Sequence, residues 1–187
     1  MREPVRITLP NEAHLLRGLA AGAEVALSGV VFTARDATHV RLVADFERLG
    51  ALPYGLVGQA LFYAGPTPPR PGRPAGSVGP TTASRMDAWT PQLLRAGVVA
   101  TIGKGPRSEE VRRACAETGA VYLVAVGGAA ALLGERVVRA EVVAFPELGP
   151  EALVRLELRD LPVFVGIDAT GGDLYASVAA QSTQESS

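Results

Sequence analysis

The alternation of apolar and polar positions along the chain predicts strands and helices that follow one another in turn. Segments rich in valine, isoleucine and leucine predict strands, which we expect over residues 5–9, 24–33, 56–64, 98–102, 121–126, 137–145, 161–167 and 174–178. Segments with helical apolar spacing or with capping residues at their ends predict helices over residues 11–19, 36–49, 90–97, 108–118 and 150–156. The strand, helix and strand within residues 98–126 predict a parallel pair with a helical crossover, and therefore an α/β domain.

Capping residues sharpen the expected boundaries of the helices. We expect Asn11, Asp36 and Thr90 to cap helix N-termini, because their side-chain oxygens can accept hydrogen bonds from free backbone N–H groups. Gly50 and Gly119 are expected to close helices in the left-handed conformation that glycine tolerates.

Residues 65–76 contain too many prolines and glycines for regular structure and predict a long surface loop. A loop of this length inside a compact domain is usually functional or a partner contact. Because neither side of the loop would form a closed core alone, we expect a single domain over residues 1–180. A polar, disordered tail is expected over residues 181–187.

Composition and charge narrow the class of protein. The chain has 187 residues, of which 48% are hydrophobic and 20% charged, and this suits one globular domain. The net charge of −1 argues against a nucleic-acid or membrane-surface role. No run approaches the roughly 18 apolar residues of a membrane span, and the first residues lack the features of a signal peptide. We therefore expect a cytoplasmic protein.

The cysteine and the histidines do not predict a metal site. Cys115 is the single cysteine, so the chain cannot form an internal disulfide or hold an iron–sulfur cluster by itself. Its position on a predicted helix favours a small buried packing residue. His14 is assigned to the surface, and His39 is expected to stay neutral and to pack or cap locally.

Residues 79–87 contain two adjacent threonines, Thr81 and Thr82, followed by Arg85. Either threonine could cap a helix whose free N–H groups would bind a carboxylate. Arg85, on the first turn, could hold that carboxylate with two parallel hydrogen bonds. An ordinary helix cap with a surface arginine is the alternative interpretation.

Lys104 is the single lysine in a chain with 17 arginines. It lies between Gly103 and Gly105 at the end of a predicted buried strand, where a group with a movable proton could serve chemistry. Chance retention on a loop is the alternative. Arg35, just before a predicted helix, could bind a second carboxylate, or it could pair with Asp36 or another neighbour.

Two glycine-rich segments do not match the spacing of nucleotide-binding motifs. Residues 127–134 lack the dinucleotide fingerprint, and residues 103–105 are not followed by the Ser or Thr of a phosphate-binding loop. Close packing of a helix on a sheet is the expected role of residues 127–134.

Residues 33–39, 79–87, 103–105 and 160–164 together resemble the C-terminal domain, or β subunit, of class I fumarases and L-tartrate dehydratases. The resemblance runs from about residue 5 to about residue 176. It implies a single swivelling β/β/α-type α/β domain with a mixed sheet and flanking helices. It also implies a partner α subunit, expected in an α2β2 heteromer, that holds a 4Fe-4S cluster on three cysteines.

The resemblance further implies a hydro-lyase that is active only with its α subunit and hydrates fumarate to L-malate. Thr81 then resembles the catalytic base, and Lys104 a residue that assists proton transfer. Arg35, Thr82 and Arg85 resemble groups that bind the dicarboxylate substrate, and no metal ligand is expected in this chain.

Ser84 and Pro106 depart from the family pattern, which usually has glycine and asparagine at these positions. Both lie beside predicted site residues, so the choice of substrate stays open. L-tartrate dehydration and non-catalytic dicarboxylate binding are the alternatives. A self-sufficient hydrolase using Thr81 or Ser84 is a weaker one, because no nucleophile, base and orienting residue can be assembled from the sequence.

Overall fold

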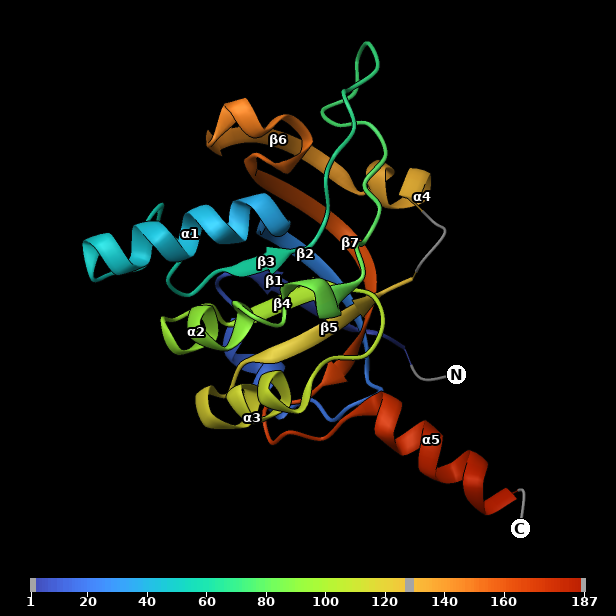
Figure 1. Cartoon of the computed structure of the whole chain (residues 1–187). Coiled ribbons are helices and arrows are strands. Elements are labelled where there is room, and N and C mark those ends of the chain that lie inside the picture. Colours follow the sequence, from blue (N-terminus) through green and yellow to red (C-terminus); the bar gives the residue numbers. More distant parts are fainter. Residues whose placement is uncertain (1–2, 127–129, 186–187) are drawn as a thin grey trace.

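The computed structural model describes residues 3–126 and 130–185 and confirms an α/β fold with a mixed sheet and flanking helices (Figure 1). The strands are β1 (Val5–Leu9), β2 (Glu24–Thr33), β3 (Ala60–Phe62), β4 (Ala100–Gly103), β5 (Val121–Ala125), β6 (Val137–Ala144) and β7 (Leu153–Ile167). The α-helices are α1 (Asp36–Leu49), α2 (Thr90–Arg95), α3 (Glu109–Thr118), α4 (Ala130–Glu135) and α5 (Leu174–Glu185). Three 3₁₀ helices are η1 (Ala13–Gly18), η2 (Ala83–Met86) and η3 (Pro146–Glu151).

The sheet closes on itself through β7. Its strand order is β1-β2-β3-β4-β5-β7-β6, and β7 pairs additionally with β2. Strands β2, β3, β4 and β5 run parallel to one another, whereas β7 is antiparallel to β2, β5 and β6. With 15 residues, β7 is long enough to pair with β5 and β2 at once, so β2, β3, β4, β5 and β7 form a barrel-like ring.

The core lies on both faces of this ring, as the alternation of side chains along a strand requires. Ala60 and Phe62 belong to the buried cluster inside the ring. Leu61 and Tyr63 point the other way, into a second buried cluster that also contains residues of α1, α2 and α3. In Figure 1 these three helices lie on one side of the strands.

The predicted crossover within residues 98–126 is confirmed. Strands β4 and β5 pair in parallel, and α3 connects them. Ser108 caps α3 by accepting a hydrogen bond from the Val111 N–H, and Gly119 closes it with φ of 70°. Gly50 closes α1 in the same way, with φ of 71°. Both predicted glycine caps are therefore confirmed.

The predicted helix over residues 150–156 is wrong. These residues end η3 and begin β7, where Leu156 and Leu158 are buried while Glu157 between them is exposed. That period of two belongs to a strand.

The strand predicted over residues 174–178 is also wrong, because α5 begins there. The Asp173 carboxylate accepts hydrogen bonds from the N–H groups of Tyr175 and Ala176 and so caps a helix. This helix runs to Glu185 and projects from the body of the domain (Figure 1). Residues 186–187 lie outside the described residues.

Several smaller boundaries shift as well. The strand expected over residues 56–64 shortens to β3, and residues 65–76 form the predicted loop. The helix expected over residues 11–19 is the shorter η1, and Asn11 does not cap it. Asp36 and Thr90 are the first residues of α1 and α2, one position after the N-cap.

The glycine-rich segment of residues 127–134 is described only from Ala130, where α4 begins. Its expected packing role therefore falls partly on residues outside those described. In the described parts of the chain, no helix has both the length and the apolar character that a membrane crossing requires.

Candidate functional site

The threonine pair and the lysine lie side by side, although they are far apart in the sequence. Beyond the end of β4, Thr82 and Lys104 form a parallel bridge. The Ala83 N–H donates to the Lys104 carbonyl at 2.9 Å, and the Lys104 N–H donates to the Thr81 carbonyl at 3.2 Å. The Thr81 N–H in turn donates to the Tyr63 carbonyl at 2.6 Å. Thr81, Thr82 and Lys104 are thus brought together at the carboxyl ends of β3 and β4.

Gly103 permits this close approach of residues 81–83 to the end of β4. A Cβ atom at this position would lie 2.9 Å from the Ala83 Cβ and 3.1 Å from the Tyr63 ring. A larger residue would push residues 81–83 away from Lys104.

The polar groups of these residues remain available to a ligand. Within the described residues, the hydroxyls of Thr81 and Thr82 and the ammonium of Lys104 make no hydrogen bond or ion pair. Thr82 is exposed, and Thr81 and Lys104 are half-buried. Two hydroxyls and one cation therefore stand at the edge of the sheet without protein partners.

Arg85 holds a carboxylate of this chain, that of Asp36, with two parallel hydrogen bonds. Its Nε lies 3.0 Å from Asp36 Oδ1 and its Nη2 2.9 Å from Asp36 Oδ2. The Arg85 side chain is 51% exposed. A guanidinium has five N–H donors, and Asp36 takes those on one edge only. The pair ties residues 79–87 to the start of α1.

Arg35 also has an acidic neighbour, Glu151 of η3, rather than Asp36. Its Nη2 lies 3.7 Å from Glu151 Oε1, while Glu151 Oε2 accepts a hydrogen bond from the Ala37 N–H at 2.8 Å. The Nε of Arg35 is buried with no acceptor among the described residues. The ion pair is too long for a hydrogen bond, so the protein does not saturate this guanidinium. Arg35 follows the carboxyl end of β2, and Lys104 follows the carboxyl end of β4, which runs in the same direction. Both residues therefore lie at the same end of the ring, and Asp36 brings Arg85 to that end as well.

The expectation that a threonine side chain caps a regular helix here is wrong. Residues 83–86 form a single 3₁₀ turn, and Thr82 stands before it without a side-chain capping bond. So short a turn has no appreciable dipole. Anion binding here depends on hydroxyl, ammonium and guanidinium groups.

His39 packs locally, as predicted. Its side chain is fully buried, and Nδ1 lies 2.7 Å from the Arg35 carbonyl, to which it donates. Its ring meets the Tyr63 ring edge-on at 5.2 Å. Burial lowers the pKa of His39 to about 4, so the imidazole is neutral at pH 7.

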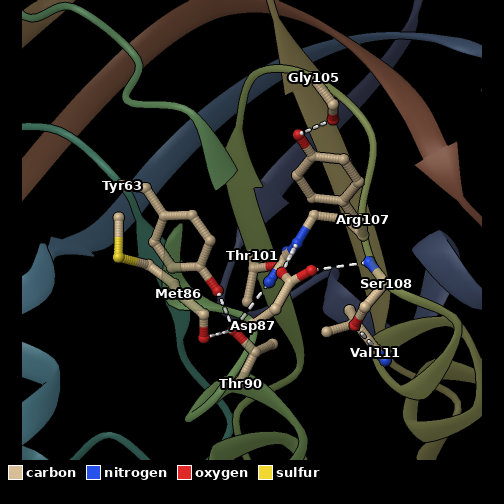
Figure 2. A network of polar contacts seen from close by, with 10 residues as sticks. Tyr63, Met86, Asp87, Thr90, Thr101, Gly105, Arg107, Ser108 and Val111 are labelled. Atoms are coloured by element: carbon tan, nitrogen blue, oxygen red, sulfur yellow. Dashed lines mark hydrogen bonds and ion pairs between the residues drawn. The ribbon is translucent and has the colours of Figure 1, made fainter. Parts of the chain in front are cut away.

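Sequence reasoning assigned no role to Arg107 and Asp87, which belong to the polar network shown in Figure 2. Arg107 Nε lies 2.6 Å from Asp87 Oδ1, and its side chain has no exposed surface. The one available signal was the position of Arg107, three residues after Lys104 in the same loop. Among 17 arginines, that signal does not stand out.

Two hollows of the surface lie away from these residues. One of about 340 Å³ lies between residues 66–75 and β6, and one of about 200 Å³ lies between residues 67–77 and α4. None of the five predicted site residues lines either hollow. The candidate site is instead an open edge at the ends of the parallel strands, where α/β sheets commonly bind ligands.

The described residues include no group of three His, Cys, Asp or Glu side chains that could hold a metal. Cys115 is fully buried, and burial raises the pKa of its thiol to about 12. The thiolate form that an iron–sulfur cluster needs is therefore disfavoured. The residues of this chain do not fit such a cluster.

Comparison with known proteins adds a family to this geometry. A family model described as "Fumarase C-terminus" matches residues 1–178. "Fumarate hydratase class I, aerobic" of Salmonella typhimurium is 36% identical over 188 residues, covering 97% of this chain. The match covers 32% of that relative, so this chain spans about a third of its length.

Two relatives named as separate subunits match over most of their own length. "L(+)-tartrate dehydratase subunit beta" of Escherichia coli is 33% identical over 175 residues, covering 91% of this chain and 86% of the relative. "Putative L(+)-tartrate dehydratase subunit beta" of Methanocaldococcus jannaschii is 34% identical over 169 residues, covering 87% of each.

Proposed function

Since this chain belongs to the fumarase C-terminus family, we propose that it is the β subunit of an iron–sulfur-dependent hydro-lyase. In this proposal it reversibly hydrates fumarate to L-malate in the cytoplasm, as part of an α2β2 heteromer. The observation that carries the proposal is the pairing of Thr81 and Thr82 with Lys104 beside Arg35 and Arg85. The α subunit would hold the 4Fe-4S cluster, because this chain offers only one buried thiol.

Arg35 and Arg85 would bind the two carboxylates of the substrate, with Thr82 donating a further hydrogen bond. Asp36 holds one edge of the Arg85 guanidinium and so fixes its direction, while the other donors stay free for a substrate oxygen. The unsaturated Arg35 guanidinium gains an acceptor in the same way. A dicarboxylate suits this site because each of its carboxylates could pair with one of the two arginines.

Thr81 and Lys104 would move the proton that hydration adds to carbon. A free threonine hydroxyl is too weak an acid to give up this proton in hydration and too weak a base to take it in dehydration, so Thr81 needs a neighbour that exchanges its proton. Lys104 is that neighbour in the proposal, because the backbone bridge holds the two residues next to each other. An arginine could not replace it, since a guanidinium does not lose a proton near neutral pH.

L-tartrate dehydration is the second candidate. It is favoured by the two relatives named as β subunits of tartrate dehydratase, which align with this chain over 86% and 87% of their length. Both substrates are dicarboxylates with a hydroxyl to remove or add, so the arginine pair does not separate them.

The test is to co-express this chain with an α-type iron–sulfur subunit, reconstitute the cluster without oxygen, and assay malate, fumarate and both enantiomers of tartrate. Lys104→Arg keeps the charge and removes the movable proton, so kcat should fall by about a hundredfold or more. Arg113→Lys, at an exposed position of α3, is the matched control and should leave kcat unchanged.

Turnover of fumarate that needs both chains would support the proposal, and turnover of tartrate alone would support the second candidate. Activity of this chain without a partner would contradict the β-subunit role. A stable complex with an intact cluster and no turnover of these acids would contradict both and leave a dicarboxylate-binding domain.

A further inference from the structure

Arg107 occupies a position that the proposed reaction does not explain. Its side chain has no exposed surface, yet it carries a charge, and its three nitrogens all have partners. Nε donates to Asp87 Oδ1 at 2.6 Å, Nη1 to Thr101 Oγ1 at 3.2 Å and Nη2 to Thr90 Oγ1 at 2.8 Å. Figure 2 shows these bonds converging on the guanidinium.

Two tyrosines complete the surroundings of this charge. The Arg107 guanidinium carbon lies 5.2 Å from the centre of the Tyr63 ring and 4.9 Å from that of Tyr122. Burial alone would lower the pKa of Arg107, but Tyr63 and Asp87 outweigh it and the pKa is raised. Burying an ion costs several kcal/mol unless its partners are well placed. The fold therefore buries a charged side chain here and gives each of its three nitrogens a hydrogen-bond partner.

The partners of Arg107 connect the two segments of the candidate site. Asp87 is the last residue of the threonine segment, residues 79–87. Its Oδ2 accepts a hydrogen bond from the Ser108 N–H at 2.7 Å. The Tyr122 hydroxyl donates to the Gly105 carbonyl at 2.8 Å. The lysine loop, residues 103–108, is thus fastened at its far end to Asp87 and at its near end to Thr81 and Thr82.

The lysine loop needs such fastening because its own sequence is flexible. Gly103 and Gly105 flank Lys104, and Gly105 has φ of 81°, a conformation that costs glycine little. Without outside contacts, a loop of this composition would sample many positions of the ammonium.

We propose that Asp87 and Arg107 form a clamp that positions Lys104 against the threonine pair. The clamp residues contact neither substrate nor the reacting atoms and act through the loop. The catalytic part of this inference rests on the proposed function, whereas the ordering of the loop does not.

The ordering can be measured without any activity, because Lys104 is the only lysine in the chain. Endoproteinase Lys-C therefore has one cleavage site, and its rate reports how often the lysine loop opens. Asp87→Asn and Arg107→Gln should each speed cleavage after Lys104 by about tenfold, since losing about 1.4 kcal/mol of local stability raises the open population by that factor. Glu109→Gln, which removes an exposed ion pair with Arg112 on α3, is the control and should leave the rate unchanged.

An arginine-specific protease separates local opening from general destabilisation. Cleavage after Arg48, near the end of α1, should stay at the wild-type rate in both variants. If cleavage at Arg48 and Lys104 rises together, or if Lys104 is cleaved no faster than in the control, the clamp is refuted. If the charge variants do not fold, Thr101→Val, which removes the acceptor of Arg107 Nη1 and keeps the charge pair, should also speed cleavage after Lys104, and an unchanged rate would refute the clamp.

In the reconstituted complex, Asp87→Asn should lower kcat by about tenfold or more while KM stays near the wild-type value, because only the proton-transfer group is displaced. The pH dependence of kcat should shift as well, which a merely smaller folded fraction would not cause. An unchanged pH profile with an unchanged kcat would overturn the catalytic part. If the wild-type complex turns over no substrate, the proposed function fails, and the protease result still decides whether the clamp orders the loop.

Discussion

His39 should make the stability of this protein fall as the pH falls from 6.5 to 4. Its imidazole is fully buried, its Nε2 has no hydrogen-bond partner among the described residues, and its Nδ1 donates to the Arg35 carbonyl. Burial, which disfavours the charged form, lowers the pKa of His39 from 6.5 to about 4, and nearby Arg107 acts in the same direction. The folded protein therefore holds His39 neutral where the unfolded chain already binds a proton.

The magnitude follows from the difference between the two pKa values. At pH 7 the imidazole is mostly neutral in both the folded and the unfolded state, so His39 causes almost no loss of stability. Below pH 6.5 the unfolded chain gains a proton and becomes more stable relative to the folded one, until the folded imidazole also titrates near pH 4. The expected loss at pH 4.5 is about 2.5 kcal/mol, approaching roughly 3 kcal/mol at lower pH.

Denaturant unfolding at pH 7.5 and pH 4.5 measures this loss when wild type is compared with His39→Gln. Glutamine can still donate to the Arg35 carbonyl but does not titrate, so the variant should lose about 2.5 kcal/mol less between the two pH values. His14→Gln is the matched control, because His14 is the other histidine and is exposed. If the His39→Gln and wild-type losses are equal, the assignment of a neutral buried imidazole is refuted.

Three further predictions test the packing and the candidate site. Cys115 should not react with the thiol reagent DTNB at pH 8 until the protein is unfolded, since it is fully buried and its pKa is about 12; rapid labelling of the folded protein would contradict this. Gly103→Ala should cost about 1–3 kcal/mol in denaturant unfolding because its Cβ would meet Ala83 at 2.9 Å, whereas Gly18→Ala, with open space around it, should cost far less. Asp36→Asn should raise the KM for a dicarboxylate several-fold by releasing Arg85, with little change in melting temperature because the ion pair is exposed; an unchanged KM would contradict an orienting role.

Much of the fold could be predicted from the sequence because local signals determine it. The strands β1 and β2 have the predicted bounds, and the helix caps at Gly50 and Gly119 depend on the residue itself and its immediate neighbours. Residues 150–156 and 174–178 were predicted wrongly because a short apolar run fits both a helix and a strand. There the outcome depends on pairing with β2 and β6 in one case and on the Asp173 cap in the other.

The candidate site divides in the same way. The sequence determined the chemistry available, namely two adjacent hydroxyls, one lysine between glycines, and the arginines beside them. It could not determine which carboxylate each arginine meets, since Asp36 reaches Arg85 and Glu151 reaches Arg35 only after the ring has closed.

Tertiary structure alone decided that Thr82 pairs with Lys104 and that Asp87 reaches Arg107. The physical reason is that the partner of a buried charge, or of the backbone at a strand end, is determined by which segments the packed strands place next to it. Sequence spacing carries no record of that neighbour, whereas the ring of β2 to β5 and β7 brings these segments together.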